Sequence, residues 1–392
     1  MEPDFTSLDD FLTDEGLDGY AFYDDESNSN LYYTTGFGAP DPFVAVYTPD
    51  AIGLLVSSLE YGRAKKEGRA DVVKRHSDYD LHAKREEHGD DALYEVLVEF
   101  FADLGVESVA VEADFGVRVA DQLRERGFDV QPESDGVIDD IRAVKTEEEI
   151  DHVREAQRAN EEAMARAEEL IRGASVEDGV LQNPEGDGAL TSEFVKQEIE
   201  ISLLRNDCSL DTTIVAAGAD AADPHDRGSG PIHEGEFVIV DIFPRNKESR
   251  YHSDMTRTFL KGEPTETQRE WYEITDEARK AALDAVEPGA TGKAVNQAVV
   301  DVYQDAGFPT VFTDPSTETG FIHSTGHGVG LDVHEGPSIS FDDNELKPGH
   351  VITIEPGLYD PEVGGVRIED IVVVTEDGYE NLTDYPIELV VD

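Results

Sequence analysis

Hydrophobic and polar residues follow two different patterns along the chain, and the change from one pattern to the other divides the chain into two parts. In the first part, short apolar runs bounded by turn residues predict strands, and apolar residues at helical spacing predict helices. The expected elements are strands at 43–47, 52–57, 108–112 and near Phe128, and helices at 90–104 and 117–126. We therefore expect an α/β domain over residues 1–144.

The second part begins where Thr146 precedes three acidic residues, which is a typical helix start because a threonine caps the first turn and acids favour it. Residues 173–190 are rich in Gly, Pro and Asp and predict a connector. The expected helices are 146–172, 191–204, 268–285 and 292–306, and the expected strands are 237–243, 255–260, 351–355, 366–374 and 387–391. Mostly antiparallel strands with outer helices predict an α+β domain over residues 145–392.

The charge of the chain is extreme. Its 392 residues include 88 acidic and 31 basic ones, which gives a net charge of -57. Disorder is excluded by the long apolar runs, and nucleic-acid binding is disfavoured because a phosphate backbone would be repelled. Such a surface suits very high salt, where self-repulsion is screened. We therefore expect the cytoplasm of a halophile.

Other features narrow the class of protein. The single cysteine, Cys208, excludes an intramolecular disulfide and is expected to be buried. The N-terminal residues lack the basic and apolar regions of a signal peptide, and no run approaches eighteen apolar residues. We expect a soluble protein that does not span or bind a membrane. His76, His82 and His88 lie in a polar stretch and are expected to be solvated.

One stretch concentrates chemically active groups. Residues 321–335 read FIHSTGHGVGLDVHE and place His323, His327 and His334 among glycines, although the whole chain has only 11 histidines. Histidine is a common metal ligand and an acid or base near neutral pH, and glycines let the backbone approach a bound group. A glycine-rich loop with solvated histidines is the alternative for any one of them.

Carboxylates stand at the ends of apolar runs. Asp241 ends one run, Asp254 begins the next, and a turn centred between residues 247 and 248 would place the two directly opposite each other. Glu355 ends a third run, and Arg367 and Glu369 share one face of a fourth if that strand is continuous. Each acid alone could form a structural ion pair, but carboxylates that face one another repel unless a cation or proton lies between them.

These groups together predict a metal site. Four carboxylates and one imidazole suit Mn²⁺, Co²⁺ or Fe²⁺ better than a cysteine-ligated zinc site. If Asp254 and Glu369 bridge, the set serves two ions, about 3.5 to 4 Å apart in such sites, with a water between them.

The motifs resemble those of the pita-bread-fold metallopeptidases, which include Xaa-Pro dipeptidase (prolidase) and aminopeptidase P. The histidine stretch is similar to the family signature, and Pro224-His225, Asp241, residues 253–258, 355–357 and 367–370 match other blocks in order. The resemblance covers residues 140–392 strongly. It extends weakly to a creatinase-type N-terminal domain through residues 32–37 and 59–64.

The resemblance implies roles for individual residues. The metal ligands would be Asp241, Asp254, His327, Glu355 and Glu369. Glu355 would also take a proton from the attacking water, and His225 and His334 would stabilise the tetrahedral intermediate or the leaving amine. His323 and Arg367 would lie beside the site, Arg367 orienting a ligating carboxylate. The implied cofactors are two divalent ions, Mn²⁺ or Co²⁺ first and Fe²⁺ or Zn²⁺ as alternatives.

Several alternatives stay open. The resemblance implies hydrolysis of short proline-containing peptides by a homodimer, but does not separate an Xaa-Pro dipeptidase from an Xaa-Pro aminopeptidase. Two segments depart from the family pattern and could reshape the pocket. Residues 242–244 are Ile-Phe-Pro where the family usually has a small residue, and the connector at 173–190 is long. A metal-free amidinohydrolase or a binding module of the same fold should lack several of these five ligand candidates. A methionine aminopeptidase would not need the N-terminal domain.

Overall fold

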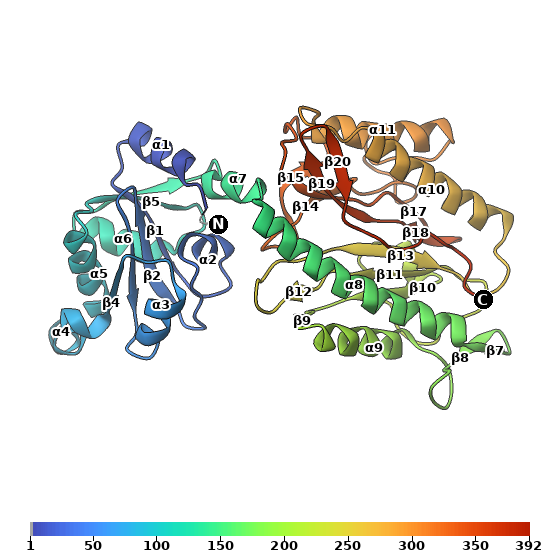
Figure 1. Ribbon diagram of the computed structural model, residues 1–392, viewed down its shortest axis with the longest axis horizontal. Helices are drawn as coiled ribbons and strands as arrows, with labels where there is room; N and C mark the ends of the chain where they lie inside the picture. The colour runs from blue at the N-terminus through green and yellow to red at the C-terminus, as the bar shows by residue number, and fades with distance from the viewer. Residues whose placement is uncertain (1–2) are drawn as a thin grey trace. The chain divides into compact units, whose positions relative to one another are not determined.

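The computed structural model describes residues 3–392 and separates into two compact units, Met1–Arg142 and Ala143–Asp392 (Figure 1). In the described residues, no helix is both long enough and apolar enough to cross a membrane.

The first unit is built on a mixed six-stranded sheet in the order β4-β3-β2-β1-β5-β6. Its strands are β1 (Gly19–Asp24), β2 (Phe43–Thr48), β3 (Ala51–Val56), β4 (Val72–Arg75), β5 (Ser108–Glu112) and β6 (Asp129–Glu133). Its α-helices are α1 (Thr6–Glu15), α2 (Ser29–Thr35), α3 (Tyr61–Glu67), α4 (Leu81–His88), α5 (Ala92–Asp103), α6 (Val117–Glu125) and α7 (Val137–Ala143). The α/β prediction is confirmed for this unit.

The core of the first unit explains both the success and the gaps of the prediction. Helix α5 buries Val96, Leu97, Phe100 and Phe101 against the sheet, which is the face its spacing indicated. β1 is central and lies between β2 and β5, so its first four residues are all buried and show no alternation of buried and exposed positions. His82 and His88 are exposed as predicted, whereas His76 is half-buried and burial lowers its pKa.

The second unit contains four long α-helices and several antiparallel sheets. The helices are α8 (Glu147–Gly173), α9 (Ser192–Arg205), α10 (Glu266–Asp284) and α11 (Gly292–Asp305). The strands are β7 (Ser175–Glu177), β8 (Val180–Gln182), β9 (Cys208–Ser209), β10 (Ile214–Ala217), β11 (Val238–Ile242), β12 (Arg245–Asn246), β13 (Met255–Phe259), β14 (Gly326–Gly328), β15 (Glu335–Ile339), β16 (Val351–Ile354), β17 (Gly357–Asp360), β18 (Gly364–Arg367), β19 (Asp370–Thr375) and β20 (Gly378–Asn381).

Threonine caps fix where the four helices begin. Thr146, Thr191, Thr265 and Thr291 each accept a hydrogen bond from a backbone N–H of the first turn, and Thr146 and Thr265 form full capping boxes. The four predicted helices are confirmed to within two residues at each end.

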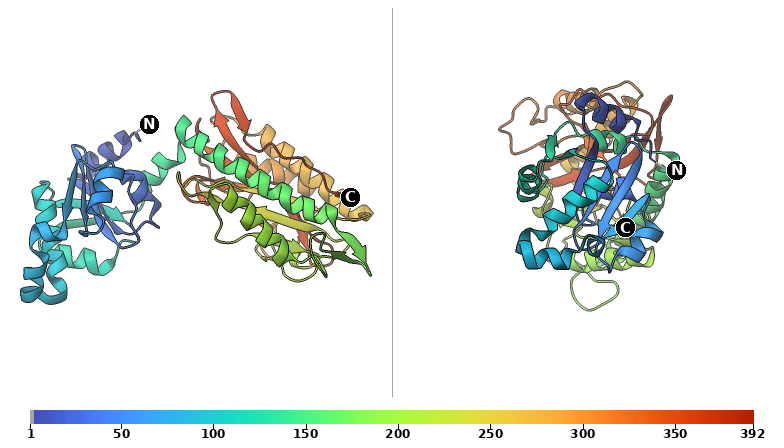
Figure 2. Two further views of the ribbon diagram at one scale, coloured as in Figure 1. Left: turned by 60° about the horizontal axis from the view of Figure 1, so that its bottom comes forward. Right: turned by 90° about the vertical axis from the view of Figure 1, so that its left-hand side faces the viewer.

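Each pair of helices packs on its own sheet. Helices α8 and α9 lie side by side (Figure 2) and share a core with the sheet β10-β11-β13. Helices α10 and α11 share the other core with β16, β18 and β19. On β11, Val238, Val240 and Ile242 face α8 and α9, so Asp241 points to the opposite face of the sheet.

Three predicted segments differ from the structure. The strand expected at 366–374 is interrupted at Ile368 and Glu369, and its halves belong to different sheets. Residues 387–391 contain only a single bridge between Val390 and Leu260. The 173–190 connector contains the hairpin β7-β8. Cys208 is buried, as predicted.

Candidate metal centre

A cavity of about 600 Å³ in the second unit brings together every site residue that the sequence indicated. These residues are His225, Asp241, Asp254, His323, His327, His334, Glu355, Arg367 and Glu369. Phe243, from the segment expected to reshape the pocket, also lines the cavity.

Separate strands deliver the ligand candidates. Asp241 lies within β11 and His327 within β14, whereas Asp254, Glu355 and Glu369 each stand one residue outside β13, β16 and β19. Backbone groups at the strand ends fix these positions. The N–H of Glu369 donates to the carbonyl of Thr256 at 3.1 Å, and that of Glu355 donates to Thr325 at 2.8 Å.

The predicted pairing of Asp241 with Asp254 is wrong by two residues. Asp241 lies opposite Thr256, so Asp254 is its diagonal neighbour on the same face. The cause is the turn, which is centred one residue later than expected. Asn246 Oδ1 accepts the N–H groups of both Glu248 and Ser249, and Arg250 adopts a φ of 68°.

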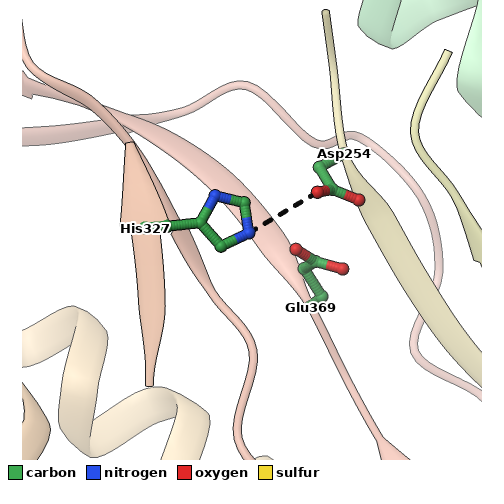
Figure 3. Close-up of side chains that lie close together, drawn as sticks. All are labelled: Asp254, His327 and Glu369. Carbon is green, nitrogen blue, oxygen red and sulfur yellow. Dashed lines mark ion pairs between the residues drawn. The ribbon is translucent and has the colours of Figure 1, made fainter. Parts of the chain in front are cut away.

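Asp254, His327 and Glu369 form a group of potential ligands, with one ligand atom from each within 4.8 Å of the others (Figure 3). His327 Nε2 lies 3.7 Å from Asp254 Oδ2 and 3.3 Å from Glu355 Oε1. Its Nδ1 lies 3.1 Å from the carbonyl oxygen of Gly328 and therefore carries the proton. The Nε2 atom is thus directed at the carboxylates.

The close approach of neighbouring backbone segments explains why glycines flank His327. A Cβ on Gly326 would lie only 2.0 Å from the carbonyl oxygen of Thr353 on β16. The side chain of Thr353 accepts the His327 N–H at 3.0 Å and donates to Glu355 Oε1 at 3.2 Å. One threonine thereby sets the spacing between two ligand candidates.

The buried carboxylates fit a cation. Asp241, Asp254 and Glu369 are 8%, 4% and 2% exposed, and one oxygen of each has no hydrogen-bond partner. Burial raises the pKa of all three, and the neighbouring carboxylates raise those of Asp254 and Glu369 further. Unpaired oxygens converging in this way match the ligand set of hard or borderline divalent ions.

Glu355 has a different electrostatic environment. Burial alone would raise its pKa, but hydrogen bonding and attraction to His327 prevail and lower the pKa to about 2. The same pairing raises the pKa of His327, although burial opposes it. The two groups therefore stabilise each other's charged forms.

Arg367 holds the other side of the centre. Its Nη2 donates to Asp241 Oδ2 at 2.7 Å, its Nε to Thr256 Oγ1 at 3.1 Å, and its Nη1 to the hydroxyl of Tyr359 at 2.9 Å. Thr256 in turn donates to Glu369 Oε2 at 2.7 Å. One guanidinium group thus orients Asp241 directly and Glu369 through Thr256.

His323 continues this network without facing the ligand group. Its Nδ1 lies 2.7 Å from the carbonyl of Ser324, so Nδ1 is the donor and Nε2 accepts from the Tyr359 hydroxyl at 2.9 Å. Burial lowers the pKa of His323 to about 4, so the ring is neutral near pH 7. Because the ring is neutral, its Nε2 can accept the hydrogen bond from the Tyr359 hydroxyl, whose oxygen in turn accepts one from Arg367 Nη1.

The remaining two histidines line the cavity as exposed groups. The His334 ring lies edge-on to the His327 ring with centroids 4.3 Å apart, and burial lowers its pKa. Within the described residues no hydrogen bond holds the rings of His225 or His334. Both imidazoles are therefore available to a bound molecule.

Sequence reasoning did not identify three contributors, Thr256, Thr353 and Tyr359. The two threonines were visible as polar residues inside apolar runs, which is a usable signal because a buried hydroxyl needs a partner. Tyr359 had no such signal, because its role depends on the pairing of β17 with β18, which places it near Arg367.

Comparisons with known proteins agree with this geometry. Residues 151–376 match the model of metallopeptidase family M24, and residues 5–144 match the creatinase/prolidase N-terminal domain. An Xaa-Pro dipeptidase of Pyrococcus furiosus is 34% identical over 92% of each chain.

Solved structures match over nearly the whole length. The prolidase of Pyrococcus horikoshii has a TM-score of 0.79 and 29% identity over 98% of each chain. An X-Pro aminopeptidase of Thermotoga maritima has a TM-score of 0.78 and 26% identity over 96% of this chain and 98% of its own. The predicted creatinase-like and pita-bread domains are confirmed. The chain belongs to metallopeptidase family M24 and is a peptidase with a creatinase/prolidase N-terminal domain.

Proposed function

We propose that this chain hydrolyses Xaa-Pro dipeptides in a reaction that depends on two divalent metal ions. The observation that carries the proposal is the convergence of three buried carboxylates with unpaired oxygens and the Nε2 of His327 in one cavity. Relatives named Xaa-Pro dipeptidase, at 34% and 31% identity over more than nine-tenths of the chain, support the choice of substrate.

The residues that would hold the ions are Asp241, Asp254, His327, Glu355 and Glu369. Oxygen-rich ligation favours Mn²⁺ or Co²⁺, with Fe²⁺ or Zn²⁺ as alternatives. Divalent ions bound there supply Lewis acidity and an activated nucleophile at neutral pH.

The chain's own groups perform the remaining work. Glu355 accepts a proton from the attacking water through its carboxylate, and Thr353 holds that carboxylate in place. His225 and His334 extend into the cavity and donate hydrogen bonds to the developing oxyanion or protonate the leaving amine. Arg367 keeps Asp241 in its ligating orientation.

The second candidate activity is that of an Xaa-Pro aminopeptidase, which releases the first residue of a longer peptide. The match to the Thermotoga maritima X-Pro aminopeptidase supports it, because its TM-score of 0.78 is close to the 0.79 of the Pyrococcus horikoshii prolidase. A metal-free amidinohydrolase is disfavoured because all five ligand candidates are present and line one cavity.

One assay separates the two activities. Purified protein in molar KCl with Mn²⁺ or Co²⁺ is given alanyl-proline and, separately, alanyl-prolyl-alanine. We expect release of proline from the dipeptide and much slower cleavage of the tripeptide. Rapid release of alanine from the tripeptide would establish the aminopeptidase instead, and cleavage of neither would refute both.

Further proposals concern the protein as a whole. We assign residues 1–144 to a creatinase-like domain and 145–392 to the catalytic domain, and we propose a homodimer. The net charge of -57 supports a high-salt cytoplasm as its place of action. Sedimentation equilibrium in molar KCl tests the dimer.

A further inference from the structure

His334 faces the cavity of the metal centre, and its ring is held by packing rather than by hydrogen bonds. Within the described residues the exposed imidazole forms no hydrogen bond, and it packs edge-on against the His327 ring with centroids 4.3 Å apart. The direction of such a side chain is set by its backbone. The position of His334 therefore depends on what fixes the loop of residues 328–335.

Glu335 anchors the end of the 328–335 loop. Its Oε2 accepts the backbone N–H of Asp332 at 3.4 Å. A Cβ on Gly330 would lie only 2.7 Å from the same oxygen, so the loop closes tightly around the carboxylate. The start of the loop has a separate anchor, because the carbonyl of Gly330 accepts the N–H of His252 at 2.7 Å. The segment that ends at His334 therefore depends on Glu335.

Lys145 holds the carboxylate of Glu335. Its Nζ contacts Glu335 Oε1 directly, and the two side chains are 1% and 8% exposed. Lys145 is itself fixed, because its backbone N–H donates to the carbonyl of Gly349 at 3.0 Å and the next residue, Thr146, caps α8. Gly349 stands two residues before β16, the strand that leads to Glu355. The loop is thus tied to the same strand that delivers a ligand candidate.

The pairing of β14 with β15 converts this anchor into a direction for His334. Gly328, which follows His327, lies opposite Glu335. Successive residues of extended backbone point to opposite sides, so Glu335 turns away from the cavity that His334 lines. A carboxylate held by Lys145 on one side therefore keeps the imidazole on the other side next to His327.

A buried ion pair suits this task better than it suits stability alone. Taking two charges out of water costs free energy that their attraction often offsets only partly, so an apolar pair of similar volume can stabilise a fold as well. A charge-assisted hydrogen bond instead fixes the distance and direction between its partners. The contact between Lys145 and Glu335 therefore points to positioning.

We infer that Lys145 is a positioning residue for catalysis, which acts through Glu335 to keep the His334 imidazole where it meets the reacting peptide. The inference rests on the proposed function, because it uses the role assigned there to His334. Lys145 does not line the cavity, so it acts on turnover only through the loop.

Kinetics of matched variants test the inference. Lys145→Met, His334→Ala and the combination of both are assayed on alanyl-proline in molar KCl with Mn²⁺, at a temperature at which circular dichroism shows each to be folded. Bound metal is measured on each preparation. Arg269→Met is the control, because it breaks an exposed ion pair of the same unit. Lys145→Met, Glu335→Gln provides a second route, because it leaves no unpaired buried charge.

We expect Lys145→Met to lower kcat about tenfold, with KM and bound metal close to wild type, because the positioned group is displaced and not removed. In the His334→Ala background the same change should alter kcat by less than about twofold, since the group that it positions is absent. Lys145→Met, Glu335→Gln should keep the low kcat although its melting temperature recovers. Arg269→Met should match wild type throughout.

A purely structural role gives a different result. The inference is overturned by a kcat within about twofold of wild type in Lys145→Met, by an undiminished loss in the His334→Ala background, by loss of bound metal, or by recovery of kcat in Lys145→Met, Glu335→Gln. A wild-type kcat in His334→Ala would also overturn it. All these outcomes leave hydrolysis by the wild type, and hence the proposed activity, intact. A wild type that does not release proline from alanyl-proline would refute the proposed function itself.

Discussion

The buried ion pair between Lys145 and Glu335 should contribute strongly to the thermal stability of the catalytic unit. Their side chains are 1% and 8% exposed, and Lys145 Nζ contacts Glu335 Oε1 directly. Lys145 lies just before α8, whereas Glu335 follows His334, so the pair joins the start of the domain to the histidine stretch. Lys145→Met removes the positive charge but keeps most of the side chain's volume.

The magnitude follows from the burial of both partners. Removing one member of a buried pair typically costs about 3 to 5 kcal/mol, because the other charge stays without compensation. At about 2 to 4 °C per kcal/mol for a unit of this size, the melting temperature should fall by about 6 to 20 °C. Since the pair is shielded from solvent, the difference should persist between one and three molar KCl.

Thermal unfolding followed by circular dichroism measures the effect. The control is Arg269→Met, which breaks the exposed contact with Glu263, where the side chains are 52% and 97% exposed, and should change the melting temperature by less than about 2 °C. The double variant Lys145→Met, Glu335→Gln should recover more than half of the loss because no charge is left unpaired. A Lys145→Met variant that melts within 2 °C of wild type would refute the reasoning.

Three further predictions rest on other features. His334→Ala should lower kcat about a hundredfold and leave the metal content and the melting temperature at their wild-type values. The control is His82→Ala, because His82 is exposed in the first unit and its replacement should change none of these three quantities. Loss of metal in His334→Ala would make His334 a ligand. His350 is 4% exposed, and its ring accepts the backbone N–H of Lys347. Burial and, to a smaller extent, the charges of nearby lysines lower the pKa of His350 to about 4. The unfolded chain then binds one more proton than the folded chain at this residue between about pH 6.5 and 4, so stability falls as the pH falls through this range. Replacing His350 with Asn should reduce the pH slope of the unfolding free energy by up to about 1.4 kcal/mol per pH unit there, and equal slopes would contradict this. Finally, the melting temperature of the wild type should fall when KCl is lowered from molar to tenth-molar, because like charges lose their screening; an unchanged value would argue against adaptation to salt.

Much of the fold could be predicted because its signals are local, and the nine candidate site residues, whose roles stay predictions, were indicated by local motifs and by the family resemblance. Capping threonines mark helix starts, and acids at the ends of apolar runs have few roles other than pairing or ligation. The histidine stretch needs glycines because Gly326 lies against Thr353 on a neighbouring strand. Each of these signals lies within a few residues in the sequence.

Features that depend on register or on distant contacts could not be predicted in this way. The pairing of Asp241 depends on how Asn246 caps a turn, which shifts the partner from Asp254 to Thr256. The interruption at Glu369 arises because the two halves of one apolar run pair with different sheets. The contact between Lys145 and Glu335 spans 190 residues and leaves no pattern in the sequence.

The central claim, that the carboxylate cluster holds the metal ions on which hydrolysis depends, is tested most directly by measuring bound metal and kcat together in Asp254→Asn. The variant loses one charge at a buried candidate ligand, and Asp305→Asn makes the same change at an exposed residue of α11. We expect about two divalent ions per chain in the wild type and in Asp305→Asn, fewer than one in Asp254→Asn, and loss of turnover only in the latter. An Asp254→Asn variant that keeps both the wild-type metal content and the wild-type kcat would contradict it.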